Sequence, residues 1–77
     1  MTEKAFNEIV EAKCAELHLR VDDGLIQNAK DADEAAAELA GESCLKPESR
    51  NFESLLAILT NEAGKLFPGN WEDYPRT

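Results

Sequence analysis

The chain has 77 residues, of which 16 are acidic and 8 are basic, and its formal net charge at pH 7 is −8. A chain of this length supports one domain with a small core, because small domains bury only about 60% of the surface that unfolding exposes. The negative charge and the scattered bases disfavour direct nucleic-acid binding, which depends on Lys and Arg that neutralise phosphates. We therefore expect a single domain over residues 1–77 that does not bind DNA or RNA directly.

The hydropathy of the sequence predicts that no segment crosses a membrane and that the protein does not bind one. No apolar run approaches the roughly 20 residues that a membrane-spanning helix needs. The first residues, 1–6, also lack the charged-then-apolar layout of a secretory signal peptide. We expect a cytoplasmic protein in which Cys14 and Cys44 are reduced thiols, buried as small apolar side chains.

The first predicted element is an amphipathic helix over residues 3–20. Its apolar side chains, from Phe6 to Val21, recur at the three- and four-residue spacing of one helical face. Thr2 is suited to cap its start. The turn sequence at residues 22–24, which contains Gly24, predicts its end.

The second predicted helix covers residues 24–40, and Asp22 or Asp23 would cap it. Leu25 and Leu39 share one predicted face with four alanines, which let a neighbouring helix approach closely but bury little surface each. Gly41 is expected to end this helix in a left-handed turn.

The third predicted helix covers residues 50–67 and has the strongest apolar stripe of the chain. Ser49 or Asn51 would cap it, and the Pro-Gly pair at residues 68–69 would end it. The tail at residues 68–77 is expected to be irregular and to fold Trp71 back onto the domain.

Three helices with short connections predict an all-α domain, arranged either as a bundle or with orthogonal packing. The stripes of the three helices predict the composition of the hydrophobic core. Its expected members are Phe6, Ile9, Val10, Leu17, Leu25, Leu39, Phe52, Leu55, Leu56, Leu59, Leu66 and Phe67.

Cys14 and His18 lie four residues apart on the first helix and could join Cys44 in a zinc site. Structural zinc sites usually have two close-spaced ligand pairs, however, and this chain has one pair and a single cysteine. A Cys–His nucleophile would need a base within reach and a group that orients it. We expect neither catalysis nor a cofactor, and a metal-binding protein stays an alternative.

Exposed apolar side chains and acids predict an interaction surface. Leu19 and Ile58 fall outside the predicted core stripes, and acidic side chains project from every helix. The candidate surface residues are Leu19, Ile58, Glu34, Glu38, Glu62 and Trp71.

The function that these features favour is a non-catalytic, regulatory protein-interaction module. Its composition is broadly like that of the small acidic inhibitors made by phages and mobile elements. Its partner would be a protein with a basic or mixed surface, or a second copy in a homodimer. The alternative is an acidic mimic of nucleic acid that occupies a basic groove through electrostatic steering.

Overall fold

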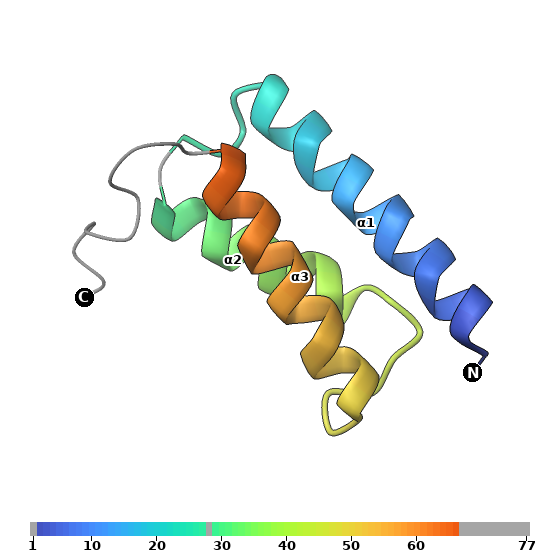
Figure 1. Cartoon of the computed structure of the whole chain (residues 1–77). Helices are drawn as coiled ribbons and strands as arrows, with labels where there is room; N and C mark the ends of the chain where they lie inside the picture. The colour runs from blue at the N-terminus through green and yellow to red at the C-terminus, as the bar shows by residue number, and fades with distance from the viewer. Residues whose placement is uncertain (1, 28, 67–77) are drawn as a thin grey trace.

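The computed structural model describes residues 2–27 and 29–66, and within them the chain forms three helices and no strand. These are α1 (Glu3–Asp22), α2 (Ala29–Gly41) and α3 (Arg50–Leu66), shown in Figure 1. The predicted all-α class is confirmed. The predicted tail at 68–77, with Trp71 and Tyr74, lies outside the described residues, as does Phe67.

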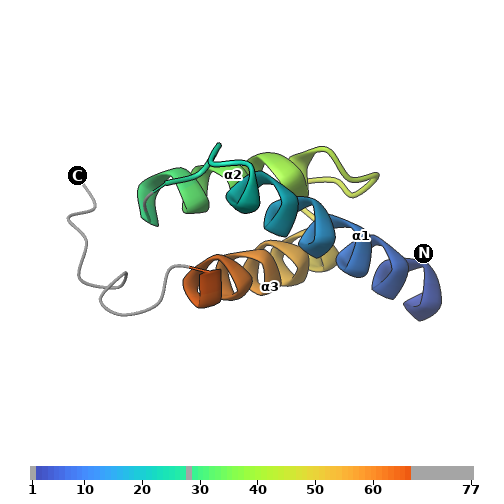
Figure 2. The same ribbon diagram turned by 90° about the horizontal axis from the view of Figure 1, so that it is seen from above.

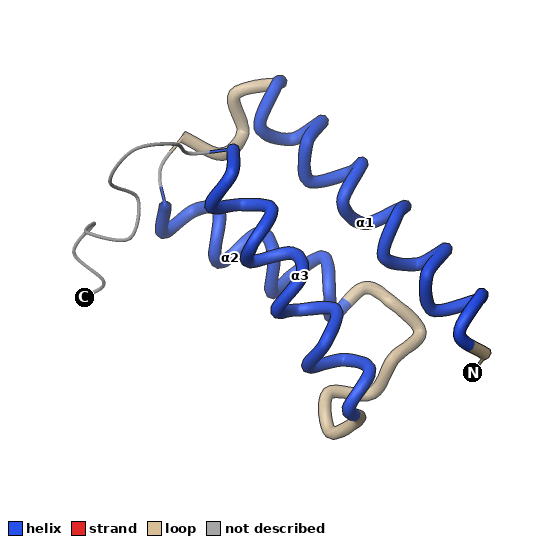
Figure 3. Tube along the Cα trace, in the orientation of Figure 1, coloured by secondary structure: helices blue, strands red, loops and turns tan. Residues whose placement is uncertain are grey.

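The helices form an up-down-up bundle. Figures 1 and 2 show that α1 and α3 run in the same general direction. α2, which lies between them in the sequence, runs in the opposite direction. Each helix packs against the other two. Short connections, which include residues 23–27 and 42–49, link successive helices, as the tube in Figure 3 shows. The two arrangements that the sequence left open are thereby resolved in favour of the bundle.

Side-chain caps fix two of the helix starts. Thr2 Oγ1 accepts a hydrogen bond from the backbone N–H of Ala5 at 3.1 Å, and Ser49 Oγ accepts one from Phe52 at 3.0 Å. Each oxygen satisfies a backbone donor that has no partner within its own helix. Both caps were expected from the sequence, and Ser49 rather than Asn51 caps α3.

Among the described residues, the glycine with a left-handed backbone is Gly24, at φ +74°, in the turn that follows α1. The expectation for Gly41 is wrong, since Gly41 is the last residue of α2 and its φ is not positive. A backbone bond from Ser43 N to Ala40 O and the Ser43 hydroxyl, which donates to the same carbonyl at 2.7 Å, close the end of α2 instead. A glycine at the end of a helix therefore need not adopt a left-handed turn when a serine satisfies one of the last carbonyls.

The core is built from a few leucines and a stripe of alanines. The buried apolar residues are Leu17, Ile26, Ala32, Ala35, Ala36, Leu39, Ala40, Leu55, Leu59 and Ala63. Six other predicted core residues are partly buried and pack against this cluster: Phe6, Ile9, Val10, Phe52, Leu56 and Leu66. They line the edges of a core that is too small to enclose them.

Leu25 does not belong to the core, contrary to expectation, because 69% of its surface is exposed. α2 begins at Ala29 and not at residue 24, while Asp22 ends α1 and Asp23 is its C-cap, so neither aspartate opens α2. The next residue, Ile26, is buried at 5% exposure. Neighbouring side chains of a non-helical connection point in different directions, so burial of Ile26 leaves Leu25 outside.

Within the described residues, none of the three helices combines the length and apolar composition needed to cross a bilayer.

Candidate interaction surface

Four of the six predicted surface residues are exposed. Leu19 on α1 is 62% exposed and Ile58 on α3 is 37% exposed, and Glu34 and Glu38 project from α2. Glu62 is only partly exposed, and Trp71 lies outside the described residues.

Leu19 faces away from the bundle, whereas Ile58 lies on the flank of α3 beside α1. Leu19 points outward from α1, because Leu17 and Val21 on the opposite face pack into the core. Ile58 lies one turn before Glu62, whose carboxylate reaches α1, so Ile58 is on the flank of α3 nearest α1. That Leu19 and Ile58 belong to one interaction surface stays a prediction.

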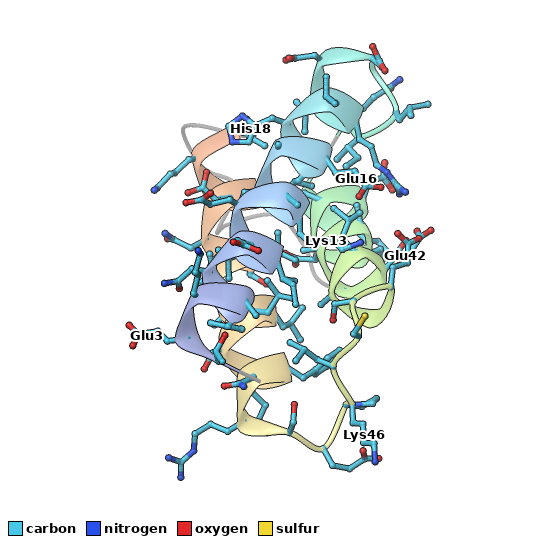
Figure 4. The ribbon with its side chains drawn as sticks, turned by 90° about the vertical axis from the view of Figure 1, so that its right-hand side faces the viewer. Glu3, Lys13, Glu16, His18, Glu42 and Lys46 are labelled. Carbon is cyan, nitrogen blue, oxygen red and sulfur yellow. The ribbon has the colours of Figure 1, made fainter. Side chains whose placement is uncertain are left out.

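A polar seam joins α1 to α2. Arg20 Nη1 lies 3.6 Å from Glu38 Oε2, and Arg20 Nη2 lies 3.3 Å from Glu16 Oε1 and 3.9 Å from Glu42 Oε1. Lys13 Nζ is 3.7 Å from both Glu16 and Glu42. Figure 4 shows Lys13, Glu16 and Glu42 gathered where α1 meets α2. Two bases of α1 therefore pair with Glu38 of α2 and with Glu42 of the connection after it, and Glu38, predicted only as a surface residue, also holds two helices together.

Beside this seam the surface is hollowed by about 200 Å³. The hollow lies between the end of α1, the connection after it and the first turns of α2, and it contains both apolar and charged groups. Its lining residues are Arg20, Leu25, Ile26, Asp31, Glu34, Ala35 and Glu38. The lining includes three carboxylates and one guanidinium, so its formal charge is negative. Its volume is below the range of about 300–1,000 Å³ typical of cofactor and drug-sized ligand sites.

A second hollow, of about 650 Å³, is broader and is lined only by residues of the first turns of α1 and its cap: Thr2, Glu3, Lys4, Asn7, Glu8 and Glu11. One helix face supplies no opposing wall, so a ligand there would keep most of its surface in water. We therefore regard the smaller hollow as the better-formed of the two.

The opposite flank of α1 is joined to α3 by Glu62. His18 Nε2 lies 3.2 Å from Glu62 Oε2, and Lys65 Nζ donates to Glu62 Oε1 at 3.0 Å. The hydrogen bonds from His18 and from Lys65 lower the pKa of Glu62. Figure 4 places His18 on this α3 side, away from Glu16 and Glu42.

Cys14 lies one turn before His18 on α1, and the charges of Glu62 and Lys65 act on its thiol. Burial raises the pKa of the Cys14 thiol, the Glu62 carboxylate raises it further, and Lys65 opposes them. A nucleophilic or metal-binding cysteine needs a lowered pKa, since its reactive form is the thiolate. Cys14, His18 and Glu62 thus lie where α1 meets α3, but burial and the Glu62 carboxylate keep the Cys14 thiol protonated.

Cys44 does not complete the metal site considered from the sequence. It is exposed in the connection after α2, contrary to the expectation that both cysteines are buried, and Cys14 is only partly buried. In the part of the chain that the structure describes, no group of three or more His, Cys, Asp or Glu side chains is arranged to hold a metal ion.

The contacts of Glu62 with His18 and Lys65 predict that Glu62 makes a pH-dependent contribution to the stability of the fold. A lowered carboxyl pKa stabilises the fold above the ordinary carboxyl range, and this contribution is lost as pH falls through the pKa of folded Glu62. We expect Glu62→Gln to lower the free energy of unfolding at pH 7 by less than about 1 kcal/mol, as exposed ion pairs usually do. The difference from wild type should shrink as pH falls below the ordinary carboxyl value of about 4, because folded Glu62 then begins to take up its proton.

Urea unfolding at pH 7 and at about pH 3 would measure this difference. The matched control is Glu53→Gln, which removes an exposed carboxylate from the same helix. A Glu62→Gln effect as large near pH 3 as at pH 7 would contradict a charge-dependent pair.

Searches against protein-family models, curated proteins and solved structures found no match to this chain. The arguments about function therefore depend on its own residues.

Of the residues that line the hollow, only Glu34 and Glu38 were predicted from the sequence as surface residues. Leu25 was assigned to the core, and Arg20 was counted only as one of the scattered bases. The four-residue spacing of Glu16 and Arg20 predicts a pair within α1. Only the packing of α2 against α1 brings Glu38 and Glu42 to the same guanidinium.

Proposed function

We propose that this chain is a non-catalytic protein-interaction module that binds a partner with a basic or mixed surface through the outer face of α1. The observation that supports this proposal is an exposed strip of small and apolar side chains, framed by acids. The strip consists of Ala12, Ala15 and Leu19, and the acids beside it are Glu8, Glu11, Asp22 and Asp23, all exposed.

Helical geometry explains why these residues share a face. Ala12, Ala15 and Leu19 follow one another at three- and four-residue spacing, which aligns them along one side of α1. Leu17, which points the other way, is fully buried against α2 and α3. The strip is therefore directed away from the bundle, where a partner can reach it.

The nearest bases do not neutralise this face. Lys13 and Arg20 are engaged with Glu16, Glu38 and Glu42 along the seam with α2. Lys4 lies on the same face but at the opposite end of α1 from Leu19. The face thus combines a small apolar contact area with a negative frame, which favours fast, salt-sensitive association with a basic surface.

The test compares proteins captured from cells by the wild type, by Leu19→Asp and by the control Ala57→Asp. Ala57 is an exposed alanine of α3, so the control adds the same charge to a different helix. We expect a defined set of partners whose recovery falls about tenfold with Leu19→Asp, as for the loss of an interface anchor. The control should retain them, and high salt should weaken their capture.

Equal recovery by Leu19→Asp and by the wild type would refute the proposed face. Displacement of a captured partner by duplex DNA would favour the nucleic-acid mimic over a partner-specific surface. Native mass spectrometry of the purified chain would show whether the partner is a second copy.

A further inference from the structure

We infer that the hollow between α1 and α2 receives an arginine side chain of the protein partner. This inference depends on the proposed function, because it identifies the chemistry by which the partner would be recognised. Its evidence is separate, however, since the hollow lies beside the outer face of α1 and shares no residue with the Ala12–Ala15–Leu19 strip.

The size and the apolar part of the hollow fit the stem of a long side chain. Leu25, Ile26 and Ala35 contribute its apolar lining, and Leu25 is 69% exposed at the surface. Arginine buries its methylene stem along such surfaces while its charged head keeps polar partners. The volume of about 200 Å³ accommodates one side chain and not a cofactor.

The charged part of the hollow fits the guanidinium group. Glu34 and Glu38 lie one turn apart on α2, so both carboxylates border the same hollow. Glu38 Oε2 forms an ion pair with Arg20 Nη1 at 3.6 Å, so one guanidinium already lies beside this carboxylate. Glu34 has no ion-pair partner among the described residues, and it supplies the charge that Arg20 leaves uncompensated.

Arginine fits better than lysine for two reasons. Its planar head can bind two carboxylates at once, and it gives up its hydration more readily than a compact ammonium group. A hollow lined by both carboxylates and apolar side chains uses both properties.

The test is an NMR titration of the full chain with Nα-acetyl-arginine amide as the probe. We expect saturable shifts of the backbone amides of Leu25, Ile26, Glu34 and Ala35, with weak affinity because the probe is a single residue. Nα-acetyl-norleucine amide, which has a stem but no charge, should produce no saturable shifts. Glu34→Gln should weaken arginine binding about tenfold, as for the loss of one charge-assisted hydrogen bond.

Glu53→Gln on α3 is the matched control and should leave binding unchanged. Circular dichroism would verify that both variants keep the helical content of the wild type. Shifts spread evenly over the acids of all three helices would overturn the inference, because they would indicate general charge screening. Equal binding of the lysine analogue would overturn the choice of arginine, and perturbation of the hollow by protein concentration alone would assign it to a second copy.

The two proposals fail in distinguishable ways. If arginine does not bind but Leu19→Asp still abolishes capture, the hollow is not a recognition site and the interaction face stands. If arginine binds the hollow but no partner set depends on Leu19, the hollow stands and the outer face of α1 does not carry the function.

Discussion

Leu59→Ala is expected to lower the free energy of unfolding by about 2–5 kcal/mol, the range for truncating a buried leucine. Leu59 is at 0% exposure in the middle of α3, within the cluster that joins all three helices. Domains have about 0.05–0.15 kcal/mol of stability per residue, so a chain of this length has roughly 4–12 kcal/mol in all. The variant should thus lose a large share of its stability, measured as a lower midpoint of urea unfolding followed by circular dichroism.

Leu25→Ala is the matched control for this experiment. It makes the same truncation at a leucine that is 69% exposed, so we expect a change within about 0.5 kcal/mol. The pair of variants also tests the placement of the chain after α1. A loss for Leu25→Ala as large as that for Leu59→Ala would mean that Leu25, and not Ile26, is the buried residue of that connection.

The sequence predicted the fold well where a strong stripe met a clear cap. α1 and α3 lie within two residues of their expected bounds, because Thr2 and Ser49 are good caps and the apolar residues of both helices recur regularly. The start of α2 was five residues too early, since Leu25 happens to fall in phase with the alanine face of that helix. Only tertiary packing decides that Ile26 is the residue buried there.

The candidate surface was only partly predictable. A single helix pattern identifies which side chains point outward, and the exposure of Leu19 and Ile58 follows from it. Patterns within one helix do not show which acids of another helix they will meet. Glu38 and Glu62 were therefore assigned to a free surface, although packing places them beside Arg20 and His18. The hollow was missed for the same reason, because its walls come from α1, α2 and the connection between them.

The alanine stripe of α2 leads to the second large expected effect. Ala32, Ala36 and Ala40 are all at 0% exposure, on the face that α2 turns toward the other helices. Side chains this small allow the helices to approach closely, and the space that remains around Ala36 is filled by its neighbours. We expect Ala36→Leu to overpack this face and lower the free energy of unfolding by about 1–3 kcal/mol, or to displace α2 from the bundle.

Ala37→Leu provides the control, because Ala37 is exposed and is the next residue of the same helix. Alanine and leucine have similar helix propensities, so this variant should stay within about 0.5 kcal/mol of the wild type. Urea unfolding of both variants measures the difference, and the near-ultraviolet circular dichroism of Ala36→Leu would reveal a repacked core. If Ala36→Leu were as stable as Ala37→Leu, α2 could not lie as close to α1 and α3 as its buried alanines indicate, and the walls of the hollow beside Glu34 would have to be placed differently.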